Sequence, residues 1–142
     1  MHHLTGDASQ ALNPLFAILL LVAAGFTLKR AAPLWILKVA LAVLVAQQGA
    51  KFVQKLHLVD GRFPSTHFAF ALAIAGAFCA LNRRYAWPVL AGCAAYGAFI
   101  VWRNFHTVLD LLGALPALPL AFLAGWRREK EARSAPAPRE VV

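Results

Sequence analysis

The sequence predicts an all-α integral membrane protein, a helical bundle of about five transmembrane helices. Of its 142 residues, 61% are hydrophobic and 14% are charged, whereas soluble domains carry about 25% charged residues. The apolar residues fall into blocks whose lengths approach the roughly 17 to 25 residues that a helix needs to cross a bilayer. Basic residues gather after alternate blocks, which is typical of the cytoplasmic loops of a membrane protein.

Each of the five apolar blocks is predicted to form a membrane helix. No Lys or Arg precedes the first block, and Lys29 and Arg30 follow it. A secretory signal peptide has the opposite charge order, so we expect this block to be a membrane helix. The third block is short, and its ends should meet polar partners or the membrane interface. The blocks span residues 12–28, 34–53, 67–82, 86–103 and 107–126, within a single transmembrane domain over 1–126.

The distribution of charge predicts the orientation in the membrane. The net charge of +8 arises mainly after the first, third and fifth blocks, which favours a topological role over nucleic-acid binding. We therefore expect the N-terminus and residues 54–66 outside and the C-terminus in the cytoplasm. Residues 127–142 are rich in Pro, Ala and charge, and they predict a disordered basic cytoplasmic tail. Cys79 and Cys93 lie inside apolar blocks without the spacing of metal ligands, so no metal site is predicted.

A first cluster of polar residues lies in "WRNFHTVLDLLGA", residues 102–114. His106 and Asp110 are four residues apart, which on a helix places them on one face and within reach of each other. Asp110 lies a turn inside the fifth block, where an isolated carboxylate is costly, so a partner is expected. The pair is either a polar contact that locks two helices together or a catalytic pair in which the carboxylate orients the imidazole.

A second cluster lies in "GRFPSTHF", residues 61–68. Ser65 or Thr66 can cap the start of the third helix, where free amides attract anions, and His67 would stand in its first turn. An ordinary capped helix start is the alternative. Because two helical crossings separate the clusters, both should lie on the same outer face of the membrane. Fixed positive charges beside this helix start would come from Lys55 and Arg62.

These motifs resemble those of the type 2 phosphatidic acid phosphatase superfamily. "FPSTH" is similar to its Pro-Ser-Gly-His motif, with Thr66 in the place of the glycine, and "HTVLDLLGA" is similar to its His-x3-Asp motif. "KLHLVDGRFP", residues 55–64, resembles its Lys-x6-Arg-Pro motif with Phe63 inserted. Ile100 stands where the family has an arginine, and Arg103 is the nearest arginine. The reduced triad of two histidines and one aspartate also resembles the sphingomyelin synthase and inositol phosphorylceramide synthase branch.

The resemblance implies the membrane core of this superfamily and a metal-independent phosphatase without a cofactor. His106 would be the nucleophile and would form a phosphohistidine, with Asp110 orienting it. His67 would protonate the leaving alkoxide and then activate water. The substrate would be a phosphomonoester or diphosphate lipid, at the extracytoplasmic face of a bacterial inner or plasma membrane. Its phosphate oxygens would be held by Lys55, Arg62, Ser65, Thr66 and Arg103.

Two other functions are compatible with these residues. A lipid phosphotransferase would pass a headgroup to an alcohol lipid through the same triad, and a catalytically inactive membrane scaffold would keep the helices without the chemistry. A homodimer is a further expectation, since small residues on helix faces allow close packing in membranes. The glycines concerned are Gly76, Gly92, Gly97 and Gly113.

Overall fold

The computed structural model describes residues 3–56 and 63–134, with side chains described for 13–56 and 63–126. Within those ranges every regular element is a helix, which confirms the predicted all-α class. Helix α1 (His3–Leu28) leads through the short turn η1 (Lys29–Ala31) into α2 (Ala32–Lys55). The later elements are α3 (Thr66–Leu81), η2 (Arg83–Tyr85), α4 (Ala86–Trp102), α5 (Val108–Leu112) and α6 (Ala117–Ser134).

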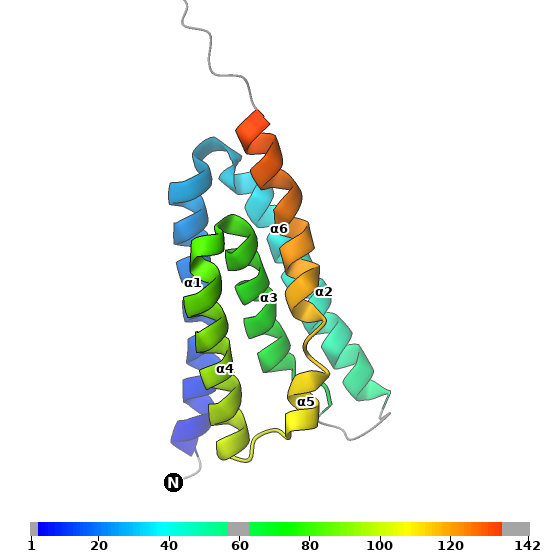
Figure 1. Ribbon diagram of the computed structural model, residues 1–142. Helices are drawn as coiled ribbons and strands as arrows, with labels where there is room; N and C mark the ends of the chain where they lie inside the picture. The colour runs from blue at the N-terminus through cyan, green and yellow to red at the C-terminus, as the bar shows by residue number, and fades with distance from the viewer. Residues whose placement is uncertain (1–2, 57–62, 135–142) are drawn as a thin grey trace, which may run out of the picture.

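Helix α3 is the centre of the bundle (Figure 1). It contacts α1, α2, α4 and α6. Its sequence, "THFAFALAIAGAFCAL", is apolar on every side, and most of its residues are buried. A helix that is apolar all round is typical of one enclosed by other elements. The short third block of the sequence is therefore the enclosed helix, around which the longer ones pack.

Two close contacts hold α6 against its neighbours. At Gly76 of α3, an added Cβ would collide with the backbone carbonyl of Leu118 and would lie 3.1 Å from the amide nitrogen of Phe122. About two turns further along α6, the indole Nε1 of Trp35 donates a buried 3.2 Å hydrogen bond to the carbonyl oxygen of Gly125. The absent side chain of Gly76 thus lets two backbones approach, and the Trp35 indole fixes α2 to the same helix.

The glycines that suggested a homodimer pack mainly within the chain. A Cβ at Gly97 would lie about 3 Å from side chains of α3 and α5, and one at Gly113 would collide with Phe63. Gly76 faces α6, as described above, whereas Gly92 has open space around it. Close intramolecular packing therefore accounts for three of the four glycines, and only Gly92 is left to support an interface between copies.

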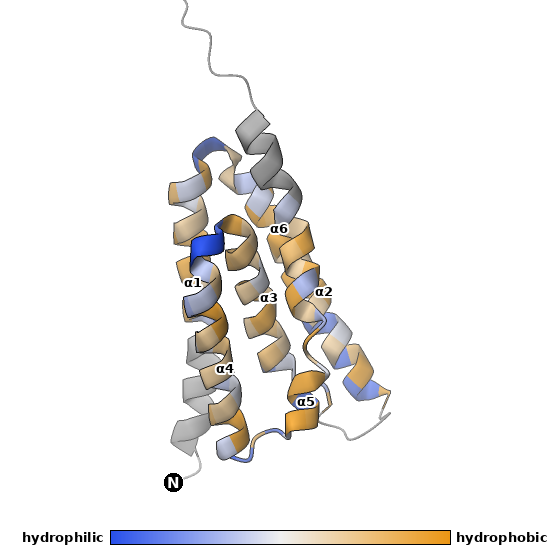
Figure 2. Ribbon diagram, viewed as in Figure 1, coloured by the Kyte–Doolittle hydropathy of each residue, from blue (hydrophilic) through white to orange (hydrophobic). Residues whose placement is uncertain are grey.

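The surface of the bundle supports a membrane protein. Among the described residues, three segments are long and apolar enough to cross a bilayer: Asn13–Lys55, Arg83–Trp102 and Val108–Trp126. The first contains both α1 and α2, which run antiparallel about η1 (Figure 1). Figure 2 shows apolar residues along the outer helices and hydrophilic ones at the turns. The count of five crossings remains a proposal, because α3 has only 16 residues.

Two predicted boundaries differ from the structure. The fifth block does not form one helix: α5 ends at Leu112 and α6 begins at Ala117, with turns between them at 113–116. Pro116 lies just before α6, and a proline disfavours helical conformation in the residue that precedes it. At the other end, α6 continues to Ser134, so the tail boundary placed at 127 does not mark the end of the helix. Residues 135–142 of the predicted tail lie outside the described residues.

We predict that Gly76→Ala lowers the thermal unfolding midpoint of the detergent-purified protein, whereas Gly92→Ala does not. The methyl group at position 76 would press on the Leu118 backbone, which cannot rotate away, and such overpacking typically costs about 1 to 3 kcal/mol. At position 92 the methyl meets nothing within 4 Å, and alanine is the better helix former by about 1 kcal/mol. Equal midpoints for the two variants would contradict the close packing of α3 on α6.

Candidate active site

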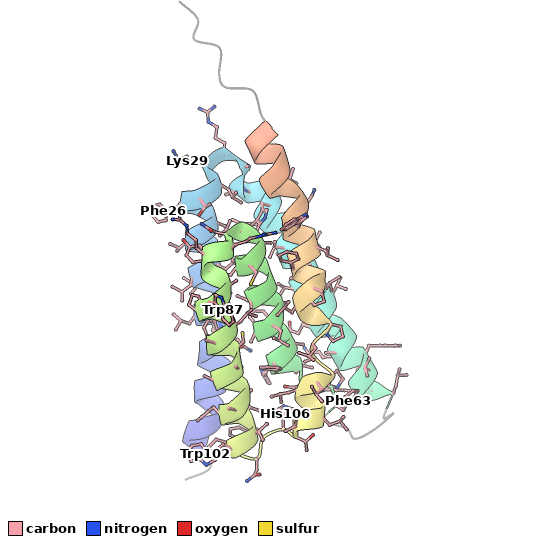
Figure 3. All side chains as sticks on the ribbon, viewed as in Figure 1. Phe26, Lys29, Phe63, Trp87, Trp102 and His106 are labelled. Atoms are coloured by element: carbon pink, nitrogen blue, oxygen red, sulfur yellow. The ribbon has the colours of Figure 1, made fainter. Side chains whose placement is uncertain are left out.

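The two predicted polar clusters meet at one end of the bundle. Phe63 and His106 lie together at the end opposite the Lys29 turn (Figure 3). The backbone N–H of Ser65 donates a 3.0 Å hydrogen bond to the backbone carbonyl of Asp110. This bond joins the segment before α3 directly to α5. The sequence-based prediction that the clusters share one face is in this respect confirmed; the side of the membrane that it faces stays a prediction.

The start of α3 is fixed by a serine cap. Ser65 has an extended backbone, its side chain is fully buried, and its Oγ accepts a 3.3 Å hydrogen bond from the amide of Phe68. The carbonyl of Pro64 accepts a 2.7 Å hydrogen bond from Nε2 of Gln54, near the end of α2. Of the two predicted capping residues, Ser65 is therefore the cap, and the turn that carries it is held from both α2 and α5.

The carboxylate of Asp110 is held by a capping box and not by helical spacing from His106. Helix α5 begins at Val108, so His106 lies in the turn before the helix, and the helical spacing of four residues is not what brings the two side chains together. Thr107 is the N-cap: its Oγ1 accepts from the Asp110 amide at 3.2 Å, and its own amide donates to Asp110 Oδ2 at 2.8 Å. This reciprocal pairing satisfies two backbone donors of the first turn.

His106 nevertheless meets Asp110. Its Nδ1 lies 3.4 Å from Asp110 Oδ2, and the two side chains are 16% and 5% exposed. This separation is within the range of an ion pair, but Nδ1 is buried and makes no hydrogen bond with the described residues. Catalytic contacts are often long or poorly aligned before the substrate binds. Because Nδ1 faces the carboxylate, Nε2 is the nitrogen left to meet a substrate.

His67 lies in the first turn of α3, exposed at the same end of the bundle. Its Nδ1 is 3.4 Å from Nδ2 of Asn13 on α1. The Ser65–Asp110 hydrogen bond ties the start of α3 to the segment that carries His106, and the Gln54–Pro64 hydrogen bond ties it to the end of α2, where Lys51 lies one turn before Lys55. The structure therefore brings both histidines and a lysine of α2 to one end of the bundle. The sequence analysis missed Asn13; an amide alone in an apolar block could have been singled out by the reasoning that singled out Asp110.

The predicted phosphate ligands are placed less completely. Lys55 is exposed at the end of α2, Arg103 is exposed in the turn after α4, and Thr66 is partly exposed beside the cap. No hydrogen bond or ion pair joins these three to either histidine among the residues described. Arg62 lies outside the described residues. Within the same described ranges, no group of three or more His, Cys, Asp or Glu is placed to hold a metal ion.

Comparison with known proteins gives one partial similarity. Over 68 residues, 47% of the chain, the sequence is 37% identical to undecaprenyl-diphosphatase BcrC from Bacillus subtilis (strain 168). The matched part covers 35% of the length of that protein, so the chain spans about a third of this relative. No family model matches the chain. No solved structure matches it either.

We predict that Ser65→Ala lowers the stability of the protein and that Thr66→Ala changes it little. The Ser65 hydroxyl caps α3, and loss of a capping side chain typically costs about 1 kcal/mol. Thr66 makes no capping bond, and substitutions away from such features usually stay within about 0.5 kcal/mol. Thermal unfolding of both variants in detergent checks this. A larger loss of stability in Thr66→Ala than in Ser65→Ala would mean that Ser65 is not the residue that caps α3.

Proposed function

We propose that this protein is a membrane lipid phosphatase, which hydrolyses a phosphomonoester or diphosphate lipid through a phosphohistidine. The observation that carries the proposal is the Ser65–Asp110 backbone hydrogen bond, which brings the helix start that carries His67 to the segment of the His106–Asp110 pair. The partial similarity to an undecaprenyl-diphosphatase supports the reaction type. The apolar surface of the helices supports the membrane setting.

In the proposed reaction, Nε2 of His106 attacks phosphorus. The bond from phosphorus to the leaving oxygen breaks, and that oxygen takes its proton from Nε2 of His67. The carboxylate of Asp110 stabilises the charge that His106 acquires in the phosphohistidine. Water then attacks phosphorus, His67 accepts a proton from it, and His106 is released with inorganic phosphate as the product. Positive charge for the phosphoryl oxygens is available from Lys51, and we assign the same role to Lys55, Arg62 and Arg103.

The amides at the start of α3 add to this positive potential. Residues 66–67 open the helix, where unpaired N–H groups and the helix dipole favour an anion. The Ser65 hydroxyl is occupied by the cap, so Ser65 would contribute through its position in the turn, and Thr66 is the hydroxyl left accessible. We assign Thr66 to phosphate binding on this ground.

An apolar groove beside the site supports a substrate with a long chain. The groove has a volume of about 290 Å³ and lies between α1, α2 and α3. Its length along α2, from Gln47 to Trp35, is about 18 Å at the helical rise per residue. The groove begins one helical turn from the residues of the site. Ala17 lies one turn from Asn13 on α1, Gln47 one turn from Lys51 on α2, and Phe70 one turn from His67 on α3. A lipid whose phosphate meets the histidines could therefore lay its chain in the groove.

We place the site on the extracytoplasmic side, with the C-terminus in the cytoplasm. The turn that carries Lys29 and Arg30 lies at the opposite end of the bundle from His106 (Figure 3). Basic residues mark cytoplasmic loops, so the histidines would face outward. A homodimer stays a proposal, for which open space at Gly92 gives the remaining support.

The test is a panel of lipid phosphates, assayed with purified protein in detergent for released phosphate and for a new phospholipid. We expect phosphate release from the wild type, and we expect His106→Ala to abolish both turnover and an acid-labile phosphoenzyme. His67→Ala should lose at least about a hundredfold on an alkyl phosphate and less on an aryl phosphate, whose leaving group needs little protonation. Transfer to an alcohol lipid without phosphate release would favour the phosphotransferase.

Gln48→Leu is a suitable control, because this amide is exposed on α2 and is not one of the residues that line the groove. A phosphoenzyme that persists in His106→Ala would assign the nucleophile to another residue. No hydrolysis and no transfer by the wild type, over the whole panel, would favour the inactive scaffold.

A bulky side chain in the groove should lower activity on long-chain substrates selectively. Ala40 lines the groove, whereas its neighbour Leu41 is exposed outside it. We expect Ala40→Trp to raise the KM for a long-chain lipid phosphate severalfold and to leave hydrolysis of a short water-soluble aryl phosphate unchanged. Leu41→Trp should alter neither. Equal effects of both variants on both substrates would exclude the groove as the site of the chain.

A further inference from the structure

Asn13 is a buried amide on a helix that is otherwise apolar around it. Its side chain is 9% exposed, and its described hydrogen-bond partner is Nδ1 of His67, 3.4 Å away. Its Oδ1 is buried and has no partner among the described residues. An amide taken out of water without hydrogen bonds costs about 1 to 3 kcal/mol in proteins. A polar residue kept at this position therefore needs a reason, and the His67 ring is the group that it meets.

We propose that Asn13 is a positioning residue for His67, whose Nδ1 it holds so that Nε2 transfers the proton. The inference rests on the proposed function and adds to it a residue from α1. The oxygen and nitrogen of an amide exchange places by a half-turn about one bond. With Oδ1 turned to the ring, Nδ1–H of His67 donates a hydrogen bond to the amide oxygen of Asn13.

This arrangement suits both halves of the reaction. Nδ1 keeps its hydrogen throughout, so only Nε2 changes. When the bond from phosphorus to the leaving oxygen breaks, Nε2–H gives its proton to that oxygen, and His67 becomes neutral. Nε2 then takes a proton from the water that attacks the phosphohistidine, and His67 regains its charge. The amide accepts from Nδ1–H in both states, so the ring need not turn between them.

The two histidines have partners of different charge, which fits their different roles. His106 faces the carboxylate of Asp110, and a carboxylate stabilises the positive charge of a phosphohistidine. His67 faces a neutral amide, and the titratable groups that act on it among the described residues are nitrogen bases: His106 from the turn before α5 and Lys51 from α2. A neutral partner orients the ring without strongly favouring its protonated form. Such a ring can lose and regain a proton within one turnover.

The contact is tested first without any substrate. In ¹⁵N-histidine spectra of the detergent-solubilised protein, the His67 signals are those lost in His67→Gln. We expect wild-type His67, when neutral, to carry its hydrogen on Nδ1, and Asn13→Leu to shift the ring toward the tautomer with the hydrogen on Nε2, which is common in free imidazoles. Gln48→Leu should leave the spectrum unchanged. Identical His67 signals in Asn13→Leu and the wild type would overturn the contact.

The catalytic role is tested by kinetics. Asn13→Leu should lower the rate on an alkyl phosphate by at least about tenfold and the rate on an aryl phosphate by less, as expected when a general acid is misplaced. Asn13→Asp, which keeps the shape, should favour protonated His67. Hydrolysis of the phosphoenzyme should then need a higher pH, and the phosphoenzyme should accumulate near neutrality. If Asn13→Leu lost the same rate factor on both substrates, and Asn13→Asp had the pH profile of the wild type, Asn13 would have only a structural role.

These outcomes separate the inference from the proposed function. If the wild type hydrolyses no substrate, the function fails, and the spectra still decide whether Asn13 holds the His67 ring. If the wild type is active and the spectra or the leaving-group dependence do not respond to Asn13, the inference fails while the function stands.

Discussion

The backbone hydrogen bond from Ser65 to Asp110 is the interaction on which the candidate site depends. The two residues are far apart in the chain, and each is fixed locally by its own cap. Ser65 caps α3, and Asp110 completes the capping box of α5. The 3.0 Å bond between their main chains therefore joins two segments that are already ordered. Since His67 follows Ser65 by two residues and His106 precedes Asp110 by four, the distance between the imidazoles is set by main-chain contacts.

The enclosed position of α3 gives this arrangement a rigid base. The helix is packed on several sides, and at Gly76 its backbone approaches that of α6 too closely for any side chain to intervene. Sites built on well-packed helices hold their geometry better than sites on loops. His106, the histidine of the first cluster, stands on a turn before α5, but the capping box and the hydrogen bond to Ser65 limit how far that turn can move.

Much of the fold could be predicted from the sequence, because apolar block length and the placement of charge are direct consequences of the bilayer. The His106–Asp110 pair was also predictable, since a carboxylate in an apolar block demands a partner. The local geometry of the pair could not be predicted. A spacing of four residues is that of one helical turn, but Thr107 caps α5, so the helix begins only after His106. The turns at 113–116 between α5 and α6 were missed for a similar reason, because a turn made of apolar residues has the same composition as an apolar helix.

The partner of His67 shows a different limit. Asn13 is distant in sequence and belongs to no motif, so its meeting with His67 depends on how α1 packs against α3. Pairwise contacts of this kind follow from tertiary structure and leave no local pattern. The glycines show the opposite limit. Their small size predicts close packing, but the neighbour that fills the space beside Gly76, Gly97 or Gly113 could be named only from the packed structure.

Under the proposed function, the shortness of α3 has a consequence for how a lipid would reach the histidines. Its 16 residues measure about 24 Å along the axis, less than the roughly 30 Å hydrocarbon core of a bilayer. If the C-terminal end of α3 reaches the cytoplasmic boundary of the hydrocarbon core, its N-terminal end lies below the outer boundary of that core. This is close to the depth at which lipid headgroups are attached to their chains. A substrate could thus present its phosphate by sideways diffusion, with its chain still among other chains. Lifting each methylene into water would cost about 0.8 kcal/mol, and a recessed helix start removes the need for that step.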